Sequence, residues 1–169
     1  MADRAAVDSN VLVYAVAGRG SKRDAARAAI AAARVVPAQA LNETAHVLRR
    51  KAGMTLPEVA AALDVIRAAL RVVPLAETTH ALALEVAGET GYSIWDASIL
   101  AAAVEAGCDR LASEDMQDGR TVRGVTIQNP FVGGRDRGAT AKLSGRWMGC
   151  LSYRLAPEGA GRAVPASHG

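Results

Sequence analysis

Aromatic residues, histidine and cysteine are scarce in this chain. Its 169 residues include one Phe, two Trp, three Tyr, three His and two Cys. So few aromatic side chains disfavour an aromatic-rich β-sandwich, whereas abundant Ala, Val and Leu favour helices and short aliphatic strands. Cys108 and Cys150 lack the spacing of zinc ligands. The composition therefore argues against a disulfide scaffold and against a zinc site.

Long apolar runs are also missing. No stretch approaches the roughly 18 consecutive apolar residues of a membrane span. The N-terminal segment MADRAAVDS carries acids and lacks the apolar region of a secretion signal. We therefore expect a soluble, cytoplasmic protein without a membrane partner. The length suits one domain with a sizeable core.

The body of the chain has no excess of positive charge. Residues 1–133 carry fourteen Lys and Arg against fifteen acids, whereas residues 134–169 carry six against two. The net charge of +3 therefore comes from the C-terminal segment. This distribution argues against a uniformly basic nucleic-acid-binding surface on the body.

Short aliphatic segments alternate with helical patterns along the body. We expect strands at 4–8, 34–37, 71–75 and 124–127, and a further strand just before Asp115. Strands that alternate with helices indicate an α/β fold with a mostly parallel sheet, here of about five strands, and right-handed crossovers. The sequence predicts a domain at 1–132, followed at 133–169 by a Gly-rich basic tail that we expect to be largely disordered.

Four carboxylates fall at or near the places where such a sheet gathers functional groups. Asp8 ends the first strand, and Asp115 follows the fourth. Glu43 follows the second strand, in what we expect to be the first turn of a helix starting near Ala40, and Asp96 opens the helix before the fourth strand. Each acid alone has a structural explanation, as a helix cap, a solvated helix acid or a turn acid.

Gathering these acids would be costly without a cation. Two carboxylates about 4 Å apart repel by roughly 4 kcal/mol at an effective dielectric near 20. Oxygen ligands without His or Cys indicate Mg²⁺ or Mn²⁺ rather than zinc. A metal of this kind suits phosphodiester hydrolysis, because it can lower the pKa of a bound water and offset charge on the phosphoryl group.

Several motifs resemble those of PIN-domain ribonucleases, and most closely those of VapC toxins from toxin–antitoxin pairs. They occur in the family's order over roughly residues 4–131. The motifs are VDSNVLVYA at 7–15, NETAHVL at 42–48, SIWDASILAAA at 93–103, LASEDMQDG at 111–119 and TIQNPF at 126–131. The four acid-bearing motifs together are a specific signal, whereas any one of them alone would be weak.

The resemblance implies a metal-dependent endoribonuclease on a three-layer α/β/α sandwich. It assigns catalytic and metal-binding roles to Asp8, Glu43, Asp96 and Asp115, with Mg²⁺ or Mn²⁺ as cofactor. It also implies an RNA substrate, a homodimer and a cognate antitoxin protein. Two further residues are candidates for supporting the acids, Asn10 and Ser93. The tail has no counterpart in the compact family domain.

Other functions remain open at this point. A stand-alone RNA-processing PIN nuclease would lack an antitoxin, and a non-cleaving PIN module would bind RNA or protein only. A haloacid-dehalogenase-type phosphatase would use Asp8 as nucleophile, but it needs a second Asp where this chain has Asn10. Beside the acids, we expect Trp95 to be a packing anchor or a dimer contact rather than a platform for base stacking, and His46 to be an ordinary histidine.

Overall fold

The computed structural model describes residues 4–132. The expectation of a disordered tail at 133–169 lies outside the described residues. The sheet has six strands in the order β3-β2-β1-β4-β6-β5. The strands are β1 (Ala5–Val7), β2 (Val35–Pro37), β3 (Arg71–Val73), β4 (Arg110–Ala112), β5 (Thr121–Val122) and β6 (Val125–Gln128).

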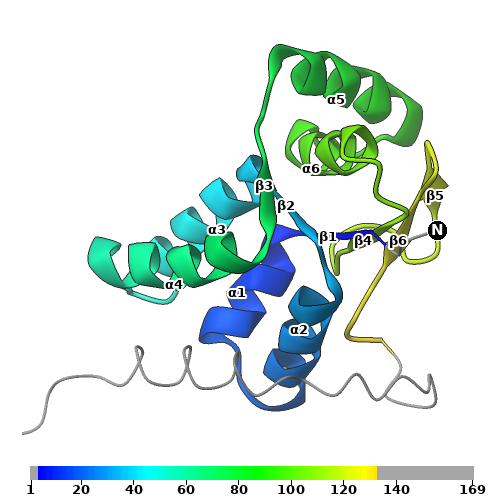
Figure 1. Cartoon of the computed structure of the whole chain (residues 1–169). Helices are drawn as coiled ribbons and strands as arrows, with labels where there is room; N and C mark the ends of the chain where they lie inside the picture. The colour runs from blue at the N-terminus through cyan, green and yellow to red at the C-terminus, as the bar shows by residue number, and fades with distance from the viewer. Residues whose placement is uncertain (1–3, 133–169) are drawn as a thin grey trace, which may run out of the picture.

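Helices cover both faces of this sheet (Figure 1). They are α1 (Ser9–Ala17), α2 (Gly20–Ala32), α3 (Ala38–Arg50), α4 (Leu56–Ala69), α5 (Glu77–Thr90) and α6 (Ile94–Glu105). The pair α5 and α6 lies on one face and the pair α1 and α2 on the other, while α3 and α4 extend beyond the β2–β3 side. This arrangement confirms the predicted α/β/α layering. Within residues 4–132, no helix is long and apolar enough to cross a membrane.

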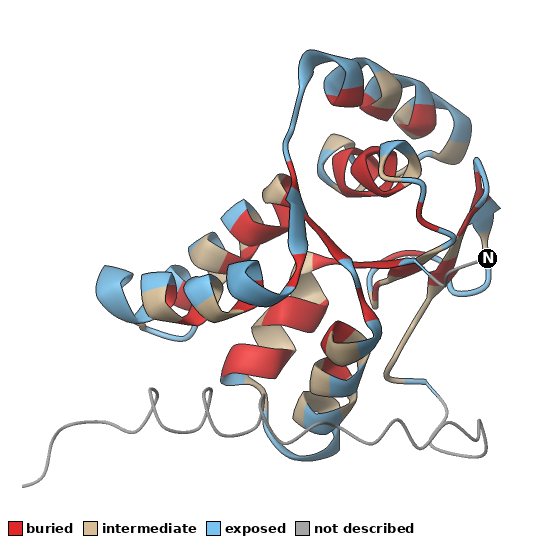
Figure 2. Ribbon diagram, viewed as in Figure 1, coloured by how far each residue is buried: buried red, intermediate tan, exposed pale blue. Residues whose placement is uncertain are grey.

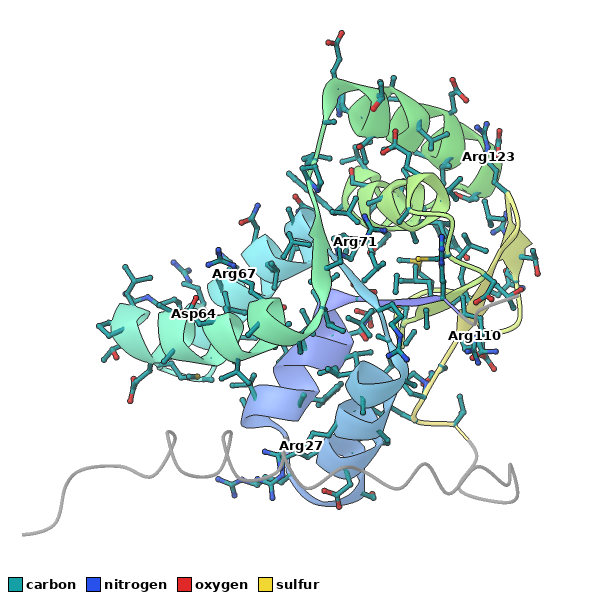
Figure 3. All side chains as sticks on the ribbon, in the orientation of Figure 1. Arg27, Asp64, Arg67, Arg71, Arg110 and Arg123 are labelled. Atoms are coloured by element: carbon teal, nitrogen blue, oxygen red, sulfur yellow. The ribbon has the colours of Figure 1, made fainter. Side chains whose placement is uncertain are left out.

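The sheet is parallel except at one edge. Each pairing among β3, β2, β1, β4 and β6 is parallel, whereas β5 pairs antiparallel with β6. The sequence analysis missed β5, because its turn is Arg123-Gly124 rather than the usual Asn-Gly. Both turn residues have positive φ, 47° and 86°, as a two-residue primed turn requires. Arg123 also pairs with Glu85 and Glu89 of α5, beside which Figure 3 labels it.

The core lies where the two helical layers meet the central strands (Figure 2). Strands β1 and β4 run through the middle of the sheet, and α6 is buried continuously from Ala97 to Ala103. Small alanine side chains let this helix pack closely on the sheet. The largest fully buried side chains include Leu12, Leu48, Ile66, Ile99, Leu100, Leu111 and Ile127.

Capping residues fix where several helices begin. Thr55 and Glu58 form a capping box at the start of α4. The expected start of α3 near Ala40 was wrong, because Pro37, at φ −64°, already caps the helix and α3 starts at Ala38. Glu43 is therefore the sixth residue of α3 and lies in its second turn, not in its first.

Truncating Leu111 should test the central core. Leu111 is fully buried in β4, so Leu111→Ala removes buried methyl groups and should lower the free energy of unfolding by about 2–5 kcal/mol. Leu84→Ala is the matched control, because Leu84 is 56% exposed on α5 and should change stability by less than about 0.5 kcal/mol. Urea unfolding measures both. Equal effects of the two variants would contradict the described core.

Candidate functional site

Asp8 lies at the junction of the central strand and the first helix. It follows β1, its backbone N–H donates to the Ala112 carbonyl at 3.0 Å, and it caps α1 by accepting from the Ser9 N–H. The Ser113 hydroxyl donates to its other carboxylate oxygen, Oδ2, at 2.6 Å. With 1% of its surface exposed, Asp8 is the most buried of the four candidate acids.

Burial changes the protonation of this carboxyl group. The pKa of Asp8 is raised from its ordinary value of 3.8 to about 6, mainly by loss of hydration on burial and to a smaller extent by the negative charge of Glu43. Hydrogen bonds from Ser113 and Ser9 favour the charged form and offset part of this rise. Ionisation of Asp8 therefore lowers the stability of the folded chain, and a cation beside the carboxylate would offset that cost.

Ser9 links Asp8 to Glu43. Its Oγ lies 3.1 Å from Asp8 Oδ1 and 3.0 Å from Glu43 Oε2. A hydroxyl has one proton, so Ser9 can donate a full hydrogen bond to only one of these carboxylates at a time. The Gln39 amide holds the other oxygen of Glu43, Oε1, at 2.9 Å, from the preceding turn of α3.

Asn10 links Asp8 to Asp115. Its Nδ2 donates to Asp8 Oδ2 at 3.0 Å and to Asp115 Oδ2 at 3.2 Å, and its Oδ1 accepts from the Glu114 N–H at 3.2 Å. Asn10, a candidate for supporting the acids, thus contacts two of them. Asp115 itself is exposed.

Asp96 is held by Ser93 and not by the residues that contact Asp8. Ser93 caps α6, accepting from the Asp96 N–H at 3.2 Å and donating to Asp96 Oδ2 at 2.7 Å. Only half of a capping box is formed here, because the Asp96 carboxylate accepts from the Ser93 hydroxyl and not from the Ser93 backbone N–H. Within residues 4–132, no hydrogen bond joins Asp96 to the network around Asp8.

Asp96 and Glu43 nevertheless line one groove. This groove has a volume of about 570 Å³ and runs between α3 and the start of α6. Its lining residues are Gln39, Asn42, Glu43, His46, Ser93, Trp95 and Asp96. Glu43 is therefore the residue that belongs both to the hydrogen-bonded network and to the groove.

These contacts bring the predicted acids to one edge of the sheet, although not into direct contact. Hydroxyl and amide groups separate the carboxylates, and no group of three His, Cys, Asp or Glu side chains in the described part of the chain is close enough to hold a metal ion. The donor set nevertheless suits a hard divalent cation, because it consists of oxygen atoms and includes a buried acid that favours a nearby positive charge. Lys22 also reaches this edge, but its amine pairs with Glu114 at 2.5 Å.

A comparison with models of known protein families identifies the family of this chain. The family model described as the PIN domain matches residues 5–118. The chain belongs to the PIN-domain family. A search of curated proteins finds no relative.

Solved structures share the fold of this PIN domain. VapC20 from Mycobacterium tuberculosis, described as a sarcin–ricin loop cleaving toxin, matches with a TM-score of 0.55 and 21% identity, over 66% of this chain and 89% of that one. VapBC2 from Rickettsia felis, solved with a DNA fragment from its promoter, matches with a TM-score of 0.56 and 13% identity, over 74% and 97%.

Sequence reasoning missed several residues of this site in the PIN domain. Ser9, Ser113 and Gln39 were not among the candidate residues, although each donates a hydrogen bond to Asp8 or to Glu43. Ser113 directly follows β4 at the edge where Asp8 follows β1, so its position in the sequence was a usable signal. Gln39 gave no such signal, because its bond to Glu43 depends on the early start of α3.

Replacing Asp8 with Asn should stabilise the metal-free protein above neutral pH. A raised folded-state pKa gives stability that is present below about pH 4 and is lost as the pH rises through about 6. Ionising Asp8 in the folded chain costs roughly 3 kcal/mol, and Asn avoids that cost while it can still accept from Ser9.

Chemical unfolding in EDTA measures this effect. We expect Asp8→Asn to be more stable than the wild type by roughly 1–3 kcal/mol at about pH 8, with the difference shrinking towards pH 4. Asp24→Asn, at an exposed acid of α2, controls for removal of a surface charge. A stability difference between Asp8→Asn and the wild type that stays the same from about pH 4 to about pH 8 would contradict the raised pKa.

Proposed function

We propose that this PIN domain is an endoribonuclease that hydrolyses RNA phosphodiester bonds with Mg²⁺ or Mn²⁺. The observation that carries this proposal is the buried Asp8 carboxylate, linked through Ser9 to Glu43 and through Asn10 to Asp115. Membership of the PIN-domain family supports the same reading. When bound, a divalent cation would offset the charge of the acids and of the phosphoryl group and would acidify a water molecule.

The protein's own contribution is to hold oxygen ligands in fixed places. Asp8 is fixed by β1 and by Ser113, and Glu43 is held by Gln39. Ser93 orients the Asp96 carboxylate at the start of α6. Because these supports come from the sheet and from helix starts, the ligands need little reordering when substrate binds, which favours catalysis.

We also propose that the chain is the toxin of a toxin–antitoxin pair. The structural similarity to VapC20 and to VapBC2 supports this proposal. It implies a small antitoxin protein as partner, and we propose a homodimer as the active assembly. The apolar side chains of Val72 and Leu75 are 36% and 47% exposed, so they are available for contact with an antitoxin or with a second copy of the chain.

Replacing the acids should abolish RNA cleavage. We expect Asp8→Asn and Asp96→Asn to reduce cleavage of total RNA in Mg²⁺ by at least about 100-fold, and Glu43→Gln and Asp115→Asn by at least about 10-fold. EDTA should stop cleavage by the wild type. Gel analysis of RNA with each purified full-length protein measures these effects.

Matched controls separate this effect from a general loss of charge. Asp24→Asn and Glu77→Gln remove exposed acids of α2 and α5 and should leave cleavage unchanged. Full activity of Asp8→Asn and Asp96→Asn would rule out the proposed site. Lack of cleavage by the wild type in Mg²⁺ and in Mn²⁺ would instead favour a binding module without nuclease activity.

A further inference from the structure

Trp95 is exposed beside a candidate catalytic acid. It is the second residue of α6, directly before Asp96, and 61% of its surface is exposed. This exposure contradicts one of the two roles expected of Trp95, a packing anchor, and leaves the other, a dimer contact, as a prediction. Leaving a large indole in water forgoes the gain from burying its apolar surface, so a ligand or partner that covers the ring would recover that gain.

The groove that Trp95 lines has the size of a small-molecule site. Its volume of about 570 Å³ falls within the range of pockets that hold small ligands. Its walls combine the indole with the side chains of Asn42 and His46, which are exposed and can form hydrogen bonds. A flat aromatic group with polar edges fits such a surface.

The charge of the groove limits what it can hold. Glu43 and Asp96 line it, and no Lys or Arg does. A phosphate would be repelled there in the absence of a cation, whereas a neutral nucleobase would not. Nucleobases stack well on exposed aromatic side chains, and such stacking accepts any base because each has a flat π-face.

We infer that the groove of Trp95 binds one nucleobase of single-stranded RNA beside the scissile phosphate. This inference rests on the proposed nuclease function. The base stacks on the indole, and Asn42 and His46 supply hydrogen bonds to its edge. Because only a sugar separates a base from its phosphate, a base held in this groove brings its own phosphate to Glu43 and Asp96, at the candidate acid site.

Tryptophan fluorescence tests the stacking directly. The chain has two tryptophans, so Trp147→Phe leaves Trp95 as the single emitter. The full-length Trp147→Phe protein is titrated in CaCl₂ with single-stranded oligoadenylate, and in parallel with inorganic polyphosphate, which carries the charge without bases. We expect saturable quenching by oligoadenylate only. Equal quenching by polyphosphate, or none by oligoadenylate, would overturn the inference.

Binding of fluorescein-labelled oligoadenylate gives the second measurement. We expect Trp95→Ala to raise Kd by about tenfold or more, and Trp95→Phe, which keeps an aromatic ring, to raise it less. Leu84→Ala, at an equally exposed apolar residue of α5, should leave Kd unchanged. A Trp95→Ala variant that binds like Leu84→Ala would overturn the inference.

Light scattering separates RNA binding from a contact between copies. Trp95→Ala should leave the molar mass of the full-length protein unchanged. A shift to a smaller species would assign Trp95 to a contact between two copies and overturn the inference. These outcomes can be told apart from a failure of the nuclease proposal. If the wild type cuts no RNA but oligoadenylate still quenches Trp95, the groove binds a base and the nuclease proposal is wrong. If cleavage needs Asp8 but Trp95→Ala binds oligoadenylate normally, the nuclease proposal holds and the base-binding inference is wrong.

Discussion

The carboxylate of Asp8 is held in the interior of the protein, where the central strand β1 passes into α1, and the arrangement of the site depends on it. Burial raises its pKa to about 6, so the charge on Asp8 costs more free energy in the folded chain than in water. Ser9, Asn10 and Ser113 donate hydrogen bonds to the same carboxylate. These bonds orient Asp8 but do not neutralise it, so a divalent cation at this edge would stabilise both the ionised acid and its neighbours.

The topology explains how distant residues reach this carboxylate. In the sheet, β1 lies between β2 and β4, so the segments that follow these three parallel strands leave from the same edge. The chain after β2 enters α3 and delivers Glu43, and the loop after β4 delivers Asp115. Asp96 reaches this edge by another route, because it lies on a helix that precedes a strand. Helix α6 leads the chain back to the start of β4, so the N-terminus of α6, which carries Asp96, lies towards the edge where the strands end.

Much of this arrangement could be predicted from the sequence. Alternating aliphatic segments and helical patterns predicted the α/β fold and its mostly parallel sheet, the family resemblance implied the three layers, and acids at or near strand ends were the candidate site residues. The hairpin strand β5 was missed because Arg123 adopts a positive φ that few non-glycine residues take. Ser113 could have been found from its place directly after β4, whereas the bond from Gln39 to Glu43 depends on where α3 starts, which the sequence pattern did not fix. The sequence left open whether Trp95 packs inward or lies on the surface as a dimer contact, because its place beside an apolar helix suits both; in the structure it is exposed.

The most direct test of the central claim is to locate a bound cation. Crystals of the full-length protein soaked in MnCl₂ and measured at the manganese absorption edge would show the ion by its anomalous signal. We expect a peak within about 2.0–2.6 Å of an Asp8 carboxylate oxygen, and its loss in Asp8→Asn. A peak that persists in Asp8→Asn, or manganese bound only away from Asp8, would contradict the proposed metal site.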